Sequence, residues 1–246
     1  MDASLILKQF QIPRNCLINR LVPKKVLYEH VSPKQRKIVQ VGLNKLRWMY
    51  ALRTDNTNIL AYRDASCAYP VVEYFIAEIE DAQAVRELAL ILMQAILHPM
   101  LLFFTWGDSL QLITADYRTN QADPSKLVVE KLIQSHIYDS GDDLHAFIQK
   151  QTFHRQSLTN FKAYYESVVS NMLREKMEIR YSIKLPKTIN PVMLDEQLNQ
   201  IEREAEELQS RIKKADQFNI RVSLQMRLHD LKIQKQNVLK QYEQQE

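Results

Sequence analysis

The chain has 246 residues, of which 46% are hydrophobic and 25% are charged, and its formal net charge is +4. These values are ordinary for a globular protein, and the three glycines argue against a loop-rich or barrel-rich fold. Two cysteines, Cys16 and Cys67, offer no disulfide framework and favour a reducing compartment, so we expect a cytoplasmic protein. No signal peptide and no membrane span are expected, because the longest apolar run falls short of the roughly 20 residues that cross a bilayer.

Charge is distributed unevenly along the chain. Residues 1–60 contain eleven Lys and Arg against three Asp and Glu, a net charge of +8. Residues 61–120 contain three Lys and Arg against eight Asp and Glu, a net charge of −5. A basic segment beside an acidic one indicates a polyanionic partner for the basic segment.

Three prolines break residues 1–33 into short pieces, so we expect an irregular arm with one helical turn near 14–20. Ser32 followed by Pro33 is typical of a helix start, with serine as the N-cap and proline in the first turn. The helix should continue to about residue 44. Its polar side carries Lys34, Arg36, Lys37 and Lys45.

The strongest fold signal lies between residues 70 and 118. Residues 71–80 are rich in β-branched and aromatic side chains, as in a strand with both faces covered. Apolar residues at helical spacing follow over 84–97. We expect the strand 71–80 to pair with a second strand over 46–52.

A hairpin completes this core. Residues 100–106 and 110–117 flank Gly107, Asp108 and Ser109, a glycine-containing hairpin turn. Residues 128–138 are predicted to form a last strand, although their spacing also fits a helix. Helices at 142–150 and 157–180 should follow, the second one capped by Ser157.

Residues 192–246 contain neither glycine nor proline, and their large apolar residues recur at three- and four-residue spacing. This pattern predicts a coiled-coil seam, whose phase slips across 214–219. The slip favours two helices folded into an antiparallel hairpin; one long helix that dimerises is the alternative. The seam is also the predicted partner-binding or oligomerisation element, through Leu194, Leu198, Ile201, Leu208, Leu224, Leu228 and Leu231.

Together these elements predict an α+β fold. We expect a mainly antiparallel sheet of about five strands packed by helices 33–44 and 84–97, followed by a C-terminal helical, coiled-coil extension. The expected domains are an α+β core with the basic N-terminal arm (1–140), a helical connector (141–187) and a coiled-coil helical hairpin (188–246).

Five segments resemble one uncharacterised bacterial family, known only as a domain of unknown function. They are residues 22–25, 43–50, 71–79, 103–112 with its Trp-Gly-Asp, and 216–222. Genes of that family tend to lie beside helicases and DNA methyltransferases of restriction-type defence islands. The resemblance therefore implies an accessory role in antiviral defence, with a helicase or methyltransferase as the protein partner, and it brings no catalytic residues with it.

A metal-dependent nuclease with a degenerate active site is the alternative function. Restriction-type nucleases hold Mg²⁺ with acidic residues and place a lysine two residues after a glutamate. Glu78 and Glu80 lie on the same side of a strand end, with Glu73 and Asp81 near, but the strand carries no lysine. These carboxylates also fit a solvated strand end beside a helix N-terminus. Because no histidines or cysteines have metal-ligand spacing, we expect no metal, no cofactor and no catalytic residues.

The basic arm is the best positive signal. Lysines and arginines beside a helix N-terminus suit phosphate contacts, and a solvated basic face is the alternative. The candidate nucleic-acid-binding residues are Lys24, Lys25, Lys34, Arg36 and Lys37. We therefore expect a non-enzymatic accessory or adaptor subunit of a DNA-acting, restriction-type complex.

Overall fold

The structure is a computed structural model that describes residues 3–96, 98–121, 123, 127–139 and 141–243. The chain divides into two compact units, residues 1–172 and 173–246. The division falls inside one helix, so it coincides with neither of the domain boundaries expected at residues 140 and 187. Each unit is described below by itself.

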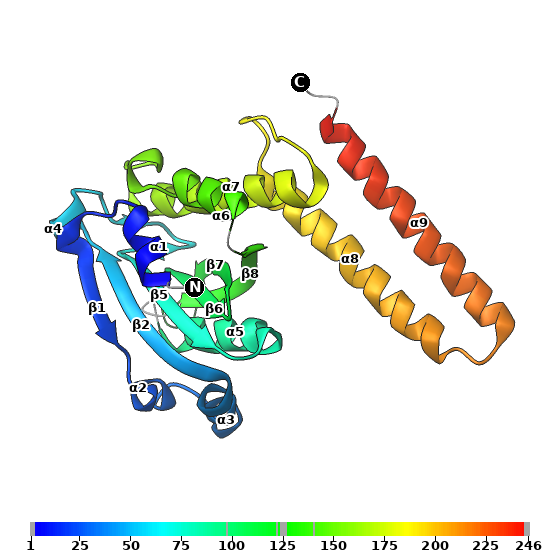
Figure 1. Cartoon of the computed structure of the whole chain (residues 1–246), viewed down its shortest axis with the longest axis horizontal. Helices are drawn as coiled ribbons and strands as arrows, with labels where there is room; N and C mark the ends of the chain where they lie inside the picture. Colours follow the sequence, from blue (N-terminus) through cyan, green and yellow to red (C-terminus); the bar gives the residue numbers. More distant parts are fainter. Residues whose placement is uncertain (1–2, 97, 122, 124–126, 140, 244–246) are drawn as a thin grey trace. The chain divides into compact units, whose positions relative to one another are not determined.

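The first unit is built on a six-stranded sheet with strand order β1-β2-β5-β6-β7-β8 (Figure 1). All neighbouring strands are antiparallel except β5 and β6, which are parallel. The predicted α+β class with a mainly antiparallel sheet is confirmed. The strands are β1 (Leu17–Leu21), β2 (Leu43–Leu52), β5 (Val72–Ile79), β6 (Met100–Trp106), β7 (Ser109–Thr119) and β8 (Leu127–Tyr138).

The parallel pair β5 and β6 needs a crossover, and α5 (Val85–Ala95) provides it. A short 3-10 turn, η2 (Ala82–Ala84), leads into the helix, and the Asp81 side chain accepts a hydrogen bond from the Gln83 amide at 2.8 Å. The helix buries an almost continuous apolar side that packs on β6, β7 and β8. Its buried residues are Val85, Leu88, Ala89, Ile91, Leu92, Met93 and Ala95.

The β6–β7 hairpin turns at Gly107, whose φ of 51° lies in the left-handed region that glycine adopts without strain. Its strands are buried along nearly their whole length, with Phe103 opposite Leu112. The burial of both strand faces explains why residues 100–106, with the exception of Thr105, are apolar rather than alternating.

The prediction of an irregular N-terminal arm is wrong. That segment contains α1 (Ala3–Gln9), η1 (Arg14–Cys16), β1 and α2 (Lys24–Tyr28), followed by α3 (Pro33–Gly42). Pro13 and Pro23 stand between elements, and Pro33 begins α3. Strand β1 gains its ladder from β2, a partner about thirty residues further along the chain that local pattern does not show. Phe10, which follows α1, packs edge-on against Phe103 with ring centroids 5.6 Å apart.

The remaining elements of the first unit cover or extend the sheet. Buried tyrosines join α7 to it: the hydroxyls of Tyr74 and Tyr164 are 2.7 Å apart, and the Tyr165 hydroxyl donates to the Ala115 carbonyl oxygen at 2.7 Å. The elements are α4 (Thr54–Thr57), the two-stranded pair β3 (Tyr62–Arg63) and β4 (Ala68–Tyr69), α6 (Asp142–Lys150), η3 (Phe153–Arg155) and the start of α7 (Phe161–Tyr181).

The predicted cap of α7 at Ser157 is wrong. The helix begins at Phe161, and the Asn160 side chain accepts a hydrogen bond from the Ala163 amide at 2.9 Å. The Ser157 amide instead donates to the Ser167 hydroxyl, and the Phe161 amide donates to the Leu60 carbonyl oxygen. These tertiary hydrogen bonds determine where the helix starts.

The second unit is a helical hairpin. It comprises the end of α7, α8 (Pro191–Lys214) and α9 (Phe218–Glu243), with α8 and α9 packed side by side (Figure 1). Asn190 caps α8 by accepting from the Val192 amide at 3.0 Å, with Pro191 in the first turn. The connection falls at residues 215–217, inside the segment where the apolar phase slips, so the structure has two helices rather than one.

Candidate functional site

The two short helices α2 and α3 form the basic corner of the first unit. Ser32 and Gln35 make a reciprocal capping box at the start of α3: the Ser32 hydroxyl accepts from the Gln35 amide at 3.3 Å, and the Gln35 side chain accepts from the Ser32 amide at 2.9 Å. Val39 is fully buried and turns one side of α3 inward. The helix packs on β2 and α5, so its orientation is set by the sheet.

Helical spacing then places three of the predicted residues on the outer side of α3. Lys34, Arg36 and Lys37 are exposed, and Lys25 is exposed on α2. Because α2 contacts α3, the structure brings together both basic groups that the sequence singled out (Figure 1). We call Lys24, Lys25, Lys34, Arg36 and Lys37 the basic corner.

Two side chains of the basic corner also hold the helices together. The half-buried Lys24 ammonium donates to the Gln40 carbonyl oxygen, near the C-terminus of α3, at 3.1 Å. The Arg36 guanidinium lies over the Tyr28 ring, 4.4 Å from its centroid. Lys25, Lys34 and Lys37 make no ion pair with any carboxylate in the described part of the chain. These three charges therefore face solvent and can meet an anion without first losing a partner.

Other cations near this end of the sheet are engaged. Lys45 forms an ion pair with Glu78 at 3.0 Å, and Arg47 donates to the Asn19 side chain at 3.0 Å. Glu80 accepts from the Asn44 side chain at 3.4 Å. The carboxylates that a nuclease would use are thus paired with neighbours on β2.

Glu73 does not belong to this acidic group. It lies at the opposite end of β5, opposite Ala51 in the strand register, whereas Glu78 is opposite Lys45. Its buried carboxylate is 3.5 Å from Nδ1 of His98. The hydrogen bond with Glu73 raises the pKa of His98 above its ordinary value, although burial acts in the other direction. Among the residues described, no three His, Cys, Asp or Glu side chains gather as ligands for a metal ion.

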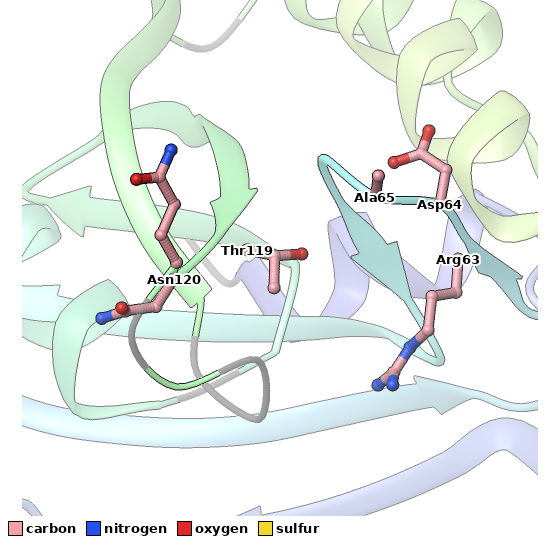
Figure 2. Close-up of a pocket in the computed structure, with 6 residues that line it drawn as sticks. Arg63, Asp64, Ala65, Thr119 and Asn120 are labelled. Atoms are coloured by element: carbon pink, nitrogen blue, oxygen red, sulfur yellow. The ribbon is translucent and has the colours of Figure 1, made fainter.

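A pocket that the sequence analysis missed lies between the β3–β4 pair and the end of β7. Figure 2 shows Thr119 and Asn120 on one segment and Arg63 and Asp64 on the other. The cavity volume is about 260 Å³. Its lining residues are Arg63, Asp64, Ala65, Thr119, Asn120 and Gln121.

Asp64 stabilises the loop beside this pocket. Its carboxylate accepts hydrogen bonds from the Ser66 amide at 2.7 Å, the Ser66 hydroxyl at 2.8 Å, the Cys67 amide at 2.7 Å and the Tyr62 hydroxyl at 2.8 Å. These bonds, the one from the Ser66 hydroxyl first, hold the pKa of Asp64 well below its ordinary value. An aspartate followed two residues later by a serine is typical of such a turn, and this spacing in the sequence could have predicted the turn. The carboxylate is saturated with donors, so its role is to hold the turn.

The predicted partner-binding leucines lie inside the second unit. Most of them are buried in the cluster between α8 and α9, while Leu224 and Leu228 are partly buried against it. The seam is therefore used within the hairpin itself, and any partner contact of this unit falls on its outer faces. The buried members are Leu194, Leu198, Ile201, Leu208 and Leu231.

The fold and these sites define an α+β protein with a basic helical corner on its sheet unit and a helical hairpin as its second unit. The chain matches, over residues 10–234, the family described as Domain of unknown function (DUF4391), and it belongs to that family. Comparison with curated proteins and with solved structures gave no match. No helix in the described chain combines the length and the hydropathy of a membrane span.

Proposed function

We propose that this protein is a non-enzymatic adaptor subunit of a DNA-acting complex and that its basic corner contacts the phosphate backbone. One observation carries the proposal. Two basic groups that are separated in the sequence, five cationic side chains in all, meet on the contacting helices α2 and α3. Three of the five side chains face solvent and form no ion pair with any residue in the described part of the chain.

The geometry suits backbone contact rather than base reading. Helix α3 is only ten residues long and packs on β2 and α5. It can therefore offer DNA only its polar side and its first turn, and it cannot insert along its length into a groove. Lysine-rich surfaces of this kind neutralise phosphates without reading sequence. An adaptor needs no more than this, because sequence recognition and catalysis belong to its partners.

The proposed partners are a helicase or a DNA methyltransferase of a restriction-type antiphage system. This part of the proposal rests on the neighbouring genes that the family resemblance implies. The proposed location is the cytoplasm, which the free cysteines Cys16 and Cys67 favour.

The experiment measures binding of the whole chain to a fluorescent DNA duplex of about 25 base pairs over a range of salt concentrations. We expect log affinity to fall linearly with log salt, with a slope of about −0.9 for each phosphate neutralised. Replacing Lys24, Lys25, Lys34, Arg36 and Lys37 by Glu should abolish binding, because the variant repels the backbone that the parent attracts.

A matched variant controls for net charge. Five exposed cations of the second unit are replaced by Glu in it: Arg211, Lys213, Lys214, Arg227 and Lys240. The change in total charge is identical, so the two variants separate a local contact from a long-range field. Equal loss in both variants, or no binding by the parent at low salt, contradicts the role of the basic corner.

The nuclease alternative is tested with the same preparation. Incubation with supercoiled plasmid and Mg²⁺ or Mn²⁺ should leave the plasmid intact, because Glu78 and Glu80 are bonded to Lys45 and Asn44. Sustained cleavage that Glu78→Ala or Glu80→Ala abolishes would replace the adaptor proposal by the nuclease.

A further inference from the structure

The outer side of α9 carries an exposed apolar stripe. Phe218, Val222, Met226 and Ile233 are separated by four, four and seven residues, which places them on one side of a helix. All four are exposed, and Phe218 and Met226 keep 79% and 66% of their surface accessible. We call these four residues the α9 stripe.

The other side of α9 is already used. Leu224, Leu228, Leu231 and Val238 face α8 in the core of the hairpin. Helical spacing puts the α9 stripe about half a turn away from them. A helix with apolar side chains on two opposite sides is typically packed against other structure on both of them.

Helix α8 provides the comparison. Its side away from the seam carries Glu196, Arg203 and Glu207, and the one large apolar side chain described as exposed on that helix is Met193. A solvated hairpin helix in this protein is therefore charged on its outside. The α9 stripe departs from that pattern on the same hairpin, which distinguishes it from scattered surface apolar residues.

Charge along the stripe selects the occupant. Helical spacing places Arg221 and Lys232 along one border of the stripe and Lys240 near its C-terminal end, while Asp230 lies towards the other border. We propose that the α9 stripe docks an acidic amphipathic helix of a partner protein, whose apolar side covers the stripe and whose carboxylates meet Arg221 and Lys232. This inference rests on the proposed adaptor function and names the surface that an adaptor would use.

A second copy of the chain is a poorer occupant. Two α9 helices packed antiparallel by a two-fold axis place equal borders against each other, so Arg221 of each copy would lie near Lys232 of the other. Four side chains also cover only a few hundred Å², below the roughly 800 Å² per partner of a stable interface. An acidic helix avoids the repulsion between cations, and further contacts within a complex would supply the rest of the buried interface area.

The test uses two synthetic peptides and the full chain. The acidic peptide is an amphipathic helix of 18 residues with leucines at helical spacing and glutamates on its polar side, and the basic peptide has lysines instead. Fluorescence anisotropy should show at least tenfold tighter binding of the acidic peptide. Met226→Asp should weaken that binding at least tenfold, and Met193→Asp, an equally exposed methionine on α8, should not change it.

Three results overturn the proposal. The first is equal binding of both peptides or no binding of the acidic one. The second is equal loss in the Met226→Asp and Met193→Asp variants. The third is evidence that something else covers the stripe. A concentration-dependent dimer that Met226→Asp abolishes would assign the stripe to a second copy of the chain. Slow thiol labelling of a Met226→Cys variant in the monomer would assign it to the chain's own first unit.

Two controls complete the design. Phe218→Ser, which introduces no charge at the start of the helix, should weaken acidic-peptide binding like Met226→Asp, and circular dichroism must show unchanged helicity in every variant. DNA is absent from this assay. Failure of peptide binding with intact salt-dependent DNA binding therefore rejects the docking surface alone, and failure of DNA binding alone rejects the basic corner.

Discussion

At the scale of single residues, Glu202 joins the three helices of the second unit. Its carboxylate accepts from the Tyr181 hydroxyl at 2.9 Å on α7 and from the Lys235 ammonium at 2.6 Å on α9, and it pairs with Arg180 at 2.9 Å. Burial acts to raise the pKa of Glu202, but the hydrogen bonds from Lys235 and Tyr181 and the nearby positive charges outweigh it and hold the pKa below its ordinary value.

The pKa shift of Glu202 predicts a pH dependence. The folded state binds this proton less readily than the unfolded state, so the stabilisation is present above the ordinary glutamate pKa of 4.5 and is lost as the pH falls below it. The protection factors of the α8 and α9 amides in the full chain, corrected for the intrinsic exchange rate at each pH, should therefore fall between about pH 5 and 3. Glu202→Gln should remove that fall, whereas Glu206→Gln, at an exposed position on α8, should keep it. An unchanged pH profile in Glu202→Gln contradicts this role.

Lys176 and Asp195 form a buried ion pair between α7 and α8, with 2.7 Å between the ammonium and the carboxylate. The Asn199 side chain donates to the other carboxylate oxygen at 2.8 Å. Lys176→Met alone should destabilise the second unit by about 3–5 kcal/mol, because it leaves a buried carboxylate without its counter-charge. The double variant Lys176→Met with Asp195→Leu should regain most of that loss in chemical denaturation. Additive losses would show that the two residues act independently.

At the scale of elements, the packing of α8 on α9 holds the hairpin together. Ile201 is buried in the middle of the seam, with 5% of its surface exposed. Ile201→Asp should cost at least about 3 kcal/mol, since it removes an apolar contact and buries a charge. Hydrogen exchange should report loss of protection in α8 and α9 with β5 to β7 unchanged. Ser210→Asp, an exposed position on the same helix, serves as the control, and loss of protection in both variants would point to charge rather than to packing.

The direction of the hairpin can be measured directly. Spin labels at residues 196 and 240 lie near the start of α8 and the end of α9, which pack side by side, so a short intramolecular distance is expected. A continuous helix across the same residues would separate the labels by about 66 Å. A long distance within one molecule would therefore exclude the hairpin in solution.

At the scale of the whole molecule, the two units give the proposed functions separate locations. The basic corner belongs to the first unit, and the α9 stripe belongs to the second. Deleting residues 192–246 should leave a folded sheet that binds DNA with an unchanged salt slope but no longer binds the acidic peptide. A truncated protein that loses both activities would show that the units depend on each other. Circular dichroism of the truncated protein distinguishes that result from simple unfolding.

The sequence by itself determined the elements whose signals are local. The strand at 72–79, the helix at 85–95, the hairpin around Gly107 and the two C-terminal helices follow from periodicity and turn chemistry within short windows. The basic corner was also visible as residue types, because charge is a property of composition. Tertiary packing did not have to be known for any of these.

Only the tertiary structure decided which distant segments meet. The pairing of β1 with β2, the parallel neighbours β5 and β6, and the start of α7 at Phe161 depend on hydrogen bonds between residues far apart in the chain. The same holds for Glu73, which packing separated from the other carboxylates of its strand and buried beside His98. Local propensity carries no information about such contacts, because a backbone group is satisfied equally well by any partner that the fold brings within reach.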